Sequence, residues 1–517
     1  MRKIYLLGAS LLLLAGCNER ISNPGPIRTS FSKISSIDIG DVAAAEITAF
    51  DPLTKQLFVV NNDEEREISQ VDVIDFSDPM NLLPLTPIDI LPYGGGVNSV
   101  AVKDGKLAIA VEGFEKTDNG KILIFDTNSL DMPVEQVLVG ALPDMVIFSP
   151  DGRYIVSANE GEPSTDYRND PEGTISLIDV TNGYQVTTLG FRAFAGKYPA
   201  LKTQGFRIFG PNILSDMDIN PTSFAQNIEP EYVTIDATSS FAWVTLQENN
   251  GIAKVDLKRK QIIEILPMGL KDHSKGQNKI DVSDRDGIVG NLKNWPLLAY
   301  YLPDAIESFE LGANTFLITA NEGDTRDYAA YGEEERVKDL KLDLTAFPNA
   351  EFLQEDENLG RYTVTTSAGD TDGDEDFDVL YGIGGRSFTI WNGRTGVMIK
   401  DYTNLESDLL MANASLYDDG RSDNKGVEPE AVEIGQIRGK NIVFVGLERS
   451  DAIMVYELNG AAGLNFLQVL DGKESIGDEG HDAPEGLLFI PDYDSPNGRS
   501  LLIVSSEGDG KITVYMN

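Results

Sequence analysis

The chain has very few of the residues that most metal and nucleophile sites use. Its 517 residues include one cysteine and two histidines, His273 and His481. One cysteine cannot form a disulfide within the chain or a cysteine-based zinc site, and two histidines exclude a zinc site with several imidazoles. The sequence contains no Walker phosphate loop and no G-x-G-x-x-G after a strand. A zinc enzyme, a Ser-His-Asp hydrolase and a nucleotide-binding domain are therefore not expected.

Positive charge is scarce as well. Lysine and arginine number 42 against 83 acids, which gives a net charge of −41. Such a protein repels phosphates and anionic lipid head groups, so no nucleic-acid partner is expected and no docking on a charged membrane surface. The excess of acid suits either a secreted protein kept soluble by its charge or a protein that binds hard cations through carboxylates.

One apolar run, Ile4–Leu14, follows the basic residues Arg2 and Lys3 and is too short to span a bilayer. The sequence LLAGC then predicts a lipoprotein signal peptide over residues 1–17, in which cleavage leaves lipid-bearing Cys17 as the new N-terminus. The alternative is an ordinary secretory peptide with an incidental cysteine. We favour the lipoprotein signal because the sole cysteine stands where lipidation requires it.

The residues after Cys17 predict the membrane in which the protein is anchored. Asn18, rather than aspartate, favours the outer membrane of a Gram-negative bacterium over retention at the inner membrane. Residues 18–30 are polar and contain proline and glycine, which predicts a flexible tether. The only expected membrane contact is the N-terminal lipid.

A repeat occupies the rest of the chain. An acidic or amide residue opens a short apolar strand, a tight turn leads to a second strand that ends in glutamate, and a third alternating strand follows. The copies begin at Glu46, Asn98, Asp144, Glu231, Asp304, Glu430 and Glu485. Their third strands are expected at residues 69–76, 120–127, 173–180, 250–257, 386–393, 451–458 and 510–517. This pattern predicts an all-β, seven-bladed β-propeller that forms one domain over residues 31–517.

The last repeat lacks a fourth strand because its third strand ends at Asn517. Residues 31–40, FSKISSIDIG, have strand composition and precede the first repeat. We predict that they supply the missing strand, which closes the ring and leaves no exposed edge there.

The acids of the repeat fall at two positions that share one face. The first two strands of a blade run antiparallel, so the start of the first and the end of the second lie together beside the central channel. Stacked carboxylates there repel each other and need cations, protons or arginines. The alternative is that the acids cap strand ends. The predicted calcium ligands are Glu46, Asp144, Glu160, Glu231, Glu248, Asp304, Glu322, Glu430, Glu448, Glu485 and Glu507.

The long insertions are expected on the same face. They span residues 161–172, 190–228, 262–302 and 323–385, whereas the turns of the opposite face are short. A rigid scaffold with long loops on one face usually carries its function there.

The largest insertion contains a second acidic motif, SAGDTDGDEDFD at residues 367–378. Asp370, Asp372, Asp374 and Asp376 alternate around a glycine, which is the spacing of a calcium-binding loop. A full EF-hand is not matched, and a solvated run of charge is the alternative.

Four arginines lie among the acids, and they are candidates to bind a phosphate or carboxylate: Arg168, Arg326, Arg386 and Arg449. The alternative is that they pair with neighbouring acids.

The order of several motifs resembles the choice-of-anchor I family, among them SPDGRYIVSANEGEPS, PDAIESFELGANTFLITANEGDTRDY and NKGVEPEAVEIGQIRGKNIVFVGLERSDAIMVYEL. The resemblance covers roughly residues 33–517. It implies a bacterial surface or secreted protein, and related animal proteins include mesenchyme-specific cell surface glycoproteins. Some members are labelled alkaline phosphatase or phytase-like, but the resemblance assigns no catalytic residues.

Three functions remain open at this stage. The first is a lipid-anchored, calcium-binding propeller that binds an unknown ligand or partner at its acidic face. The second is a calcium-dependent phosphoesterase that uses the same face. The third is a propeller whose calcium is structural and whose partner docks on the blade sides. We favour the first, as a monomer, because no nucleophile or general base stands out.

Overall fold

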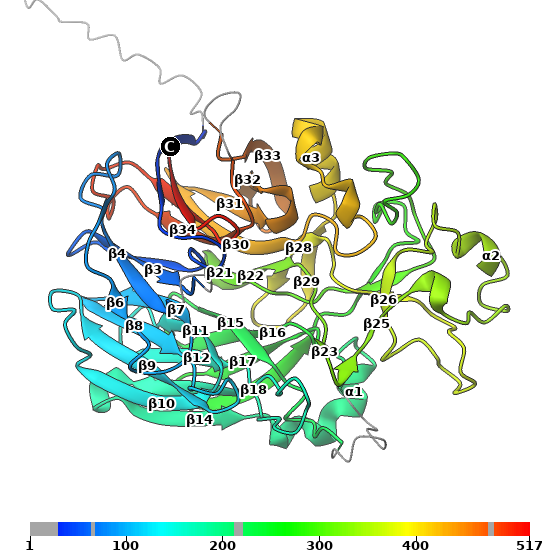
Figure 1. Ribbon diagram of the computed structural model, residues 1–517, viewed down its shortest axis with the longest axis horizontal. Helices are drawn as coiled ribbons and strands as arrows, with labels where there is room; N and C mark the ends of the chain where they lie inside the picture. Colours follow the sequence, from blue (N-terminus) through cyan, green and yellow to red (C-terminus); the bar gives the residue numbers. More distant parts are fainter. Residues whose placement is uncertain (1–28, 64–67, 211–220, 474–479) are drawn as a thin grey trace, which may run out of the picture.

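The computed structural model describes residues 29–63, 68–210, 221–473 and 480–517. The predicted signal peptide, Cys17 and the tether up to residue 28 lie outside the described residues. The described chain consists mostly of antiparallel strands (Figure 1). No helix in these ranges is long and apolar enough to cross a membrane.

Most sheets contain four strands that follow one another in the chain. Their expected third strands all form within one residue of the predicted bounds. The sheets are β2 (Thr48–Asp51), β3 (Gln56–Asn61) and β4 (Gln70–Asp75) with β5 (Leu83–Pro84) and β6 (Ile88–Asp89); β7 (Val97–Lys103), β8 (Lys106–Val111), β9 (Asn119–Asp126) and β10 (Glu135–Ala141); and β11 (Pro143–Phe148), β12 (Tyr154–Asn159), β13 (Thr174–Asp179) and β14 (Gln185–Gly190). They continue with β15 (Pro230–Ile235), β16 (Phe241–Leu246), β17 (Gly251–Asp256) and β18 (Gln261–Pro267); β21 (Ile306–Leu311), β22 (Asn314–Asn321), β28 (Ser387–Asn392) and β29 (Met398–Tyr402); and β30 (Pro429–Ile437), β31 (Lys440–Leu447), β32 (Ala452–Asn459) and β33 (Gly463–Leu470).

Several turns between first and second strands are tight, although residues 491–500 form a longer connection between the strands at 484–490 and 501–506. Between β7 and β8, Asp104 and Gly105 both have positive φ, 50° and 75°. This is the geometry of a two-residue type I′ turn, whose twist matches that of the strands it joins.

The first strands of the sheets stand side by side in a closed order: β2, β7, β11, β15, β21, β30, β34 (Pro484–Ile490) and again β2. Each space between neighbouring sheets is filled by buried apolar side chains. Val60 of β3 packs in one cluster with Leu107 of β8, for example, and Phe388 of β28 in one cluster with Tyr456 of β32. The sheets therefore surround a central axis, as the blades of a β-propeller do.

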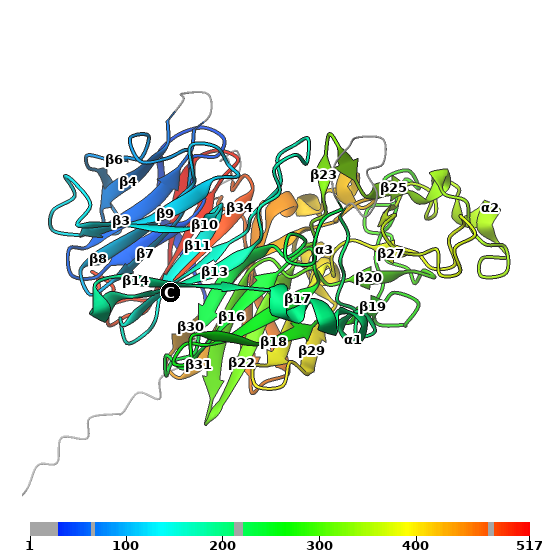
Figure 2. The same ribbon diagram turned by 90° about the horizontal axis from the view of Figure 1, so that it is seen from below.

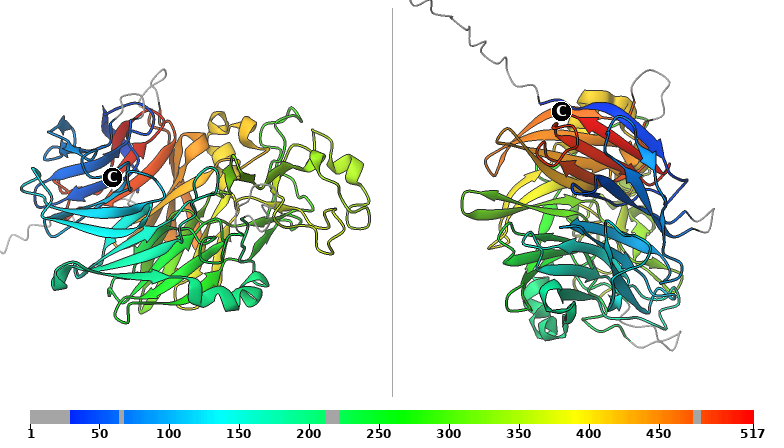
Figure 3. Two further views of the ribbon diagram at one scale, coloured as in Figure 1. Left: turned by 60° about the horizontal axis from the view of Figure 1, so that its bottom comes forward. Right: turned by 90° about the vertical axis from the view of Figure 1, so that its left-hand side faces the viewer.

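The two ends of the described chain meet in one sheet. Strand β1 (Ser32–Asp38) pairs antiparallel with β36 (Lys511–Met516), beyond which lie β35 (Leu501–Ser506) and β34. Figure 3 shows the blue N-terminal strand beside the red C-terminal one. The predicted closing strand over residues 31–40 is confirmed.

Two successive insertions, which flank residues 303–322, build an additional sheet. Its strands are β19 (Leu270–Asp272), β20 (Leu298–Tyr300), β27 (Tyr381–Gly382), β26 (Thr363–Thr365) and β25 (Glu334–Arg336). With α2 (Ala350–Leu353) it encloses its own apolar core, which includes Trp295, Phe347 and Tyr362. Figures 1 and 2 show this module at one end of the molecule.

The module shows that two of the segments predicted as long loops contain strands. Residues 262–302 and 323–385 contain these strands, and residues 262–267 belong to β18, the outer strand of its sheet. The insertions also contain α1 (Tyr198–Lys202), β23 (Asp327–Tyr328) and β24 (Tyr331–Gly332), and α3 (Leu405–Asn413) lies between β29 and β30. The parallel pairing of β20 with β27 joins segments about eighty residues apart, which local sequence pattern cannot indicate.

Candidate functional site: an acidic cavity on the propeller axis

A cavity of about 830 Å³ lies where the first and second strands of the sheets meet the axis. We call it the acidic cavity. Every predicted calcium ligand of the repeat lines it, as does Glu112: Glu46, Glu112, Asp144, Glu160, Glu231, Glu248, Asp304, Glu322, Glu430, Glu448, Glu485 and Glu507. Because β-strand pairs are antiparallel, the start of each first strand and the end of each second strand arrive at the same point.

A repeated backbone feature positions these acids. Leu142, just before the proline that starts β11, has φ of 47°, and its carbonyl accepts a hydrogen bond of 2.8 Å from the Glu160 amide. A residue other than glycine in this left-handed region is strained, and such strain gathers at functional sites. The same conformation before a proline recurs at Leu302, Glu428 and Ala483.

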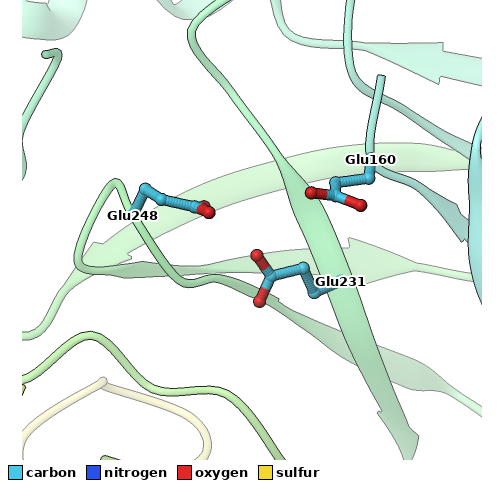
Figure 4. A group of neighbouring side chains, drawn as sticks. All are labelled: Glu160, Glu231 and Glu248. Carbon is cyan, nitrogen blue, oxygen red and sulfur yellow. The ribbon is translucent and has the colours of Figure 1, made fainter. Parts of the chain in front are cut away.

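Three carboxylates within the cavity converge on one point. Glu160, Glu231 and Glu248 each offer an oxygen, and these oxygens lie within 4.8 Å of one another (Figure 4). We call this group the open cluster. Glu231 and Glu248 are only 7% and 6% exposed, and the Oε2 atom of each is buried without a hydrogen-bond partner among the described residues. No salt bridge from a described lysine or arginine reaches the three side chains.

The pKa values in the open cluster are raised. Burial is the main cause for all three residues, and neighbouring carboxylates add to it. The pKa of Glu248 rises to about 7, first through burial and then through Asp324. Burial and the charge of Glu248 raise the pKa of Glu231 well above its usual value. At neutral pH the cluster must therefore hold protons or bind a cation.

Several other acids of the cavity share this property. Burial raises the pKa of Glu46 to about 8, with the charge of Glu507 as the next cause. It also raises the pKa of Asp144 to about 7. The pKa is raised, with burial as the first cause, for Asp304, Glu430, Glu485 and Glu507 too. The cavity as a whole thus favours positive charge.

A second convergent group has the opposite environment. We call it the paired cluster, and it consists of Glu322, Glu428 and Glu448. Lys425 Nζ lies 3.2 Å from Glu322 Oε1, and Arg421 Nη2 lies 2.7 Å from Glu428 Oε1. Arg449 reaches both Glu428, at 2.9 Å, and Glu448, at 2.8 Å. Three bases therefore neutralise this group from within the chain.

The acids of the 367–378 loop separate into two groups. Asp370, Asp372 and Asp374 are exposed and have oxygens within 4.8 Å of one another. Asp376 instead lies with Asp343 and Asp378 and forms a 3.2 Å salt bridge with Lys341. The four aspartates predicted as one calcium loop are thus not all brought together, because Asp376 packs beside Asp343 and Lys341 instead.

A family model, the choice-of-anchor I domain, matches residues 46–461. The chain belongs to the choice-of-anchor I family. The resemblance seen in the sequence is thereby confirmed, and the acidic cavity is a feature of a choice-of-anchor I domain.

Two curated proteins are similar to this choice-of-anchor I chain. Gigasin-3a of Magallana gigas is 29% identical over 188 residues, which are 32% of this chain and 66% of that protein. The mesenchyme-specific cell surface glycoprotein of Strongylocentrotus purpuratus is 26% identical over 329 residues, 55% of this chain and 42% of that protein. The chain thus spans less than two thirds of the length of either relative.

Solved structures of similar shape include hydrazine synthase of Kuenenia stuttgartiensis and the β-propeller domain of Cps50 (Swd1) of Myceliophteria thermophila. Their TM-scores are 0.46 and 0.45, each at 10% identity. The similarity covers 93% of this chain in both cases, and 97% and 98% of the other chains.

The four candidate anion-binding arginines of the choice-of-anchor I domain are not brought together. Only Arg449 lines the acidic cavity. Arg168 is exposed and pairs with its neighbour Asp166 at 3.3 Å. Arg326 is buried against Glu229, and Arg386 is buried and donates to the backbone carbonyls of residues 281, 422 and 424. Each of these guanidinium groups therefore already contacts a carboxylate or a backbone carbonyl of the same chain.

The structure also brings residues to the site that sequence reasoning missed. Glu428 belongs to the paired cluster, and Lys116, Asp324 and Lys425 line the acidic cavity. Glu229 lies close enough to Glu160 for its charge to raise the pKa of Glu160, although burial, Glu162 and Asp144 contribute more. The tripeptide Glu-Pro-Glu, present at both 229–231 and 428–430, could have drawn attention to Glu229 and Glu428.

Proposed function

We propose that this chain is a lipid-anchored, seven-bladed β-propeller of the cell surface that binds calcium in its acidic cavity. The open cluster is the principal ion site, and the bound ion prepares this face for a ligand or partner.

The open cluster carries the proposal. Calcium binds oxygen ligands at 2.3–2.6 Å, so two ligands on opposite sides of one ion are at most about 5 Å apart. The 4.8 Å limit within which the three oxygens lie suits an ion of this size. The unpartnered Oε2 atoms of Glu231 and Glu248 are groups that a cation would satisfy, and no described base forms a salt bridge with either side chain.

Family membership and the sequence support the location. The Strongylocentrotus relative, which is 26% identical over 329 residues, is named a cell surface glycoprotein. Lipid on Cys17, as LLAGC predicts, would hold this chain on the outer membrane of a Gram-negative bacterium.

The phosphoesterase alternative is less well supported. A phosphate ester requires positive charge that is free to meet it. The bases that line the acidic cavity are Lys116, Lys425 and Arg449, and each already contacts a carboxylate of the chain. The surplus of acids in the cavity favours a cationic ligand over an anionic one.

Calorimetric titration of residues 18–517 with calcium, after treatment with chelator, tests the proposal. We expect saturable binding at pH 8. The triple variant Glu160→Gln, Glu231→Gln, Glu248→Gln should lose the strongest binding step. Glu135→Gln, at an exposed position of β10, is the matched control and should bind as the wild type does. Unchanged binding in the triple variant would place the ion elsewhere.

A further inference from the structure

The open cluster and the paired cluster occupy equivalent positions of the repeat. In each, one glutamate ends a second strand: Glu160 after β12 and Glu322 after β22. The next sheet that begins with Glu-Pro-Glu supplies the other acids. Around β15 and β16 these acids are Glu229, Glu231 and Glu248, of which the open cluster uses Glu231 and Glu248. Around β30 and β31 they are Glu428, Glu430 and Glu448, of which the paired cluster uses Glu428 and Glu448.

The contacts within the two groups correspond as well. Glu231 follows Pro230, which pairs with Leu246 of β16, and Glu430 follows Pro429, which pairs with Leu447 of β31. The first acid of each Glu-Pro-Glu is held by arginine. Arg326 holds Glu229, whereas Arg421 and Arg449 hold Glu428. The two sites are therefore built alike from the same element of the repeat.

They differ at the glutamate that ends the second strand. The Glu160 side chain forms no salt bridge with a described base. Glu322 accepts hydrogen bonds from Lys425 Nζ at 3.2 Å and from Gln247 Nε2 at 2.7 Å. Lys425 Nζ also donates to Asp324 Oδ1 at 3.0 Å, and its side chain is only 15% exposed.

We infer that Lys425 is a tethered cation that occupies the paired cluster and thereby limits the acidic cavity to the open cluster as its strong calcium site. This inference rests on the proposed function, because it takes the open cluster as an ion site. It assigns Lys425 the role of setting how many ions the cavity holds.

The physical basis is competition between charges for the same carboxylates. The ammonium carries three donors and a full charge, and it is supplied by the segment that leads into β30. Lys425 Nζ contacts both Glu322, at 3.2 Å, and Asp324, at 3.0 Å. A calcium ion could bind Glu322 only after displacing this ammonium.

Ion stoichiometry distinguishes this role from a structural one. We would measure calcium bound per chain by equilibrium dialysis at pH 8, for the wild type and for Lys425→Met. The variant should bind one more ion per chain than the wild type, because Glu322 and Asp324 lose the ammonium and can bind calcium in its place. Lys425→Arg keeps the charge and should bind the wild-type number.

Further variants locate the gained ion and provide controls. Glu322→Gln added to Lys425→Met should remove the gain. Lys440→Met is the matched control, since Lys440 forms a 2.7 Å contact with Glu457 at the opposite end of β31 and should bind the wild-type number. If Lys425→Met does not fold, Lys425→Gln replaces it.

The decisive quantity is the difference between variant and wild type. No gain in Lys425→Met, or a gain that persists with Glu322→Gln, overturns the role of Lys425. A wild type that binds no calcium refutes the proposed function instead. In that case a gain of one ion in the variant still supports the assignment of Lys425.

Discussion

Arg326 and Glu229 form a two-pronged salt bridge beside the acidic cavity. Nε donates to Oε2 at 3.2 Å, and Nη2 contacts Oε1. The two residues are 2% and 1% exposed, and Arg326 Nη1 also donates to the Tyr167 hydroxyl at 3.0 Å. Because Arg326 belongs to the insertion after β22 and Glu229 precedes β15, the pair fastens the insertion to the strand that carries Glu231.

Removal of Arg326 should destabilise the protein strongly. Arg326→Met leaves Glu229 as a buried carboxylate without its partner, a change that typically costs about 3–5 kcal/mol. Urea unfolding measures the loss. Adding Glu229→Gln should restore much of it, because the stranded charge disappears. Arg168→Met, which removes an exposed pair, is the control and should change stability by at most about 0.5 kcal/mol. Equal effects of the two arginine variants would contradict this interpretation of the buried pair.

Without calcium, stability should fall as pH rises from about 5 to about 8. The pKa of Glu248 rises from 4.5 to about 7 and that of Glu46 from 4.5 to about 8 on folding, chiefly through burial. The native state therefore holds protons that the unfolded chain releases in this window, so the free energy of unfolding decreases with pH. Melting temperatures in chelator at several pH values test the slope. Calcium should flatten it by taking the place of the protons, and a melting temperature that climbs steadily to pH 8 in chelator would refute the expectation.

Neutral replacements in the open cluster should have opposite effects on stability and on binding. Glu231→Gln with Glu248→Gln removes carboxylates whose ionisation is costly in the buried site. In chelator at pH 8 this double variant should melt above the wild type. In saturating calcium the order should reverse, because only the wild type gains binding energy, about 2.7 kcal/mol at about 100 times Kd. A double variant that melts lower under both conditions would mean that these carboxylates are structural.

We predict that the exposed aspartates of the insertion form a separate and weaker ion site. Asp372→Asn with Asp374→Asn should reduce the calcium-dependent rise in melting temperature without altering binding at the open cluster. Combined with the open-cluster variants, the two reductions should add, as they do for distant sites that share no partner. A combined loss smaller than the sum would show that the sites are coupled.

The lipid anchor is tested at its attachment point. Cys17→Ser should release the protein from the membrane fraction or leave an uncleaved precursor, because lipidation requires the thiol. Fractionation and the mass of the mature chain report both outcomes. Asn18→Asp is an informative companion and should shift the protein toward the inner membrane. Unchanged membrane association of Cys17→Ser would argue for a different anchor.

Sequence alone determined the scaffold and the position of the acids. The recurrence of acids before one strand and after the next, in nearly every copy of the repeat, predicts where each carboxylate lies, because strand periodicity and antiparallel pairing are local properties. Every acid so predicted, from Glu46 to Glu507, lines one cavity. The closing pair of β1 and β36 could also be predicted, since the last repeat visibly lacks a strand.

Tertiary structure alone decided which of these acids act together. Glu160, Glu231 and Glu248 come from three different strands, so their separation depends on how the sheets pack around the axis. Asp376 is separated from the group that contains Asp370 because the chain folds back and places Asp376 beside Asp343. Glu160 forms no salt bridge with a described base, whereas Glu322 contacts Lys425, about a hundred residues further along the chain. A charge at that sequence distance leaves no trace in a local pattern, yet in space it forms a salt bridge with Glu322.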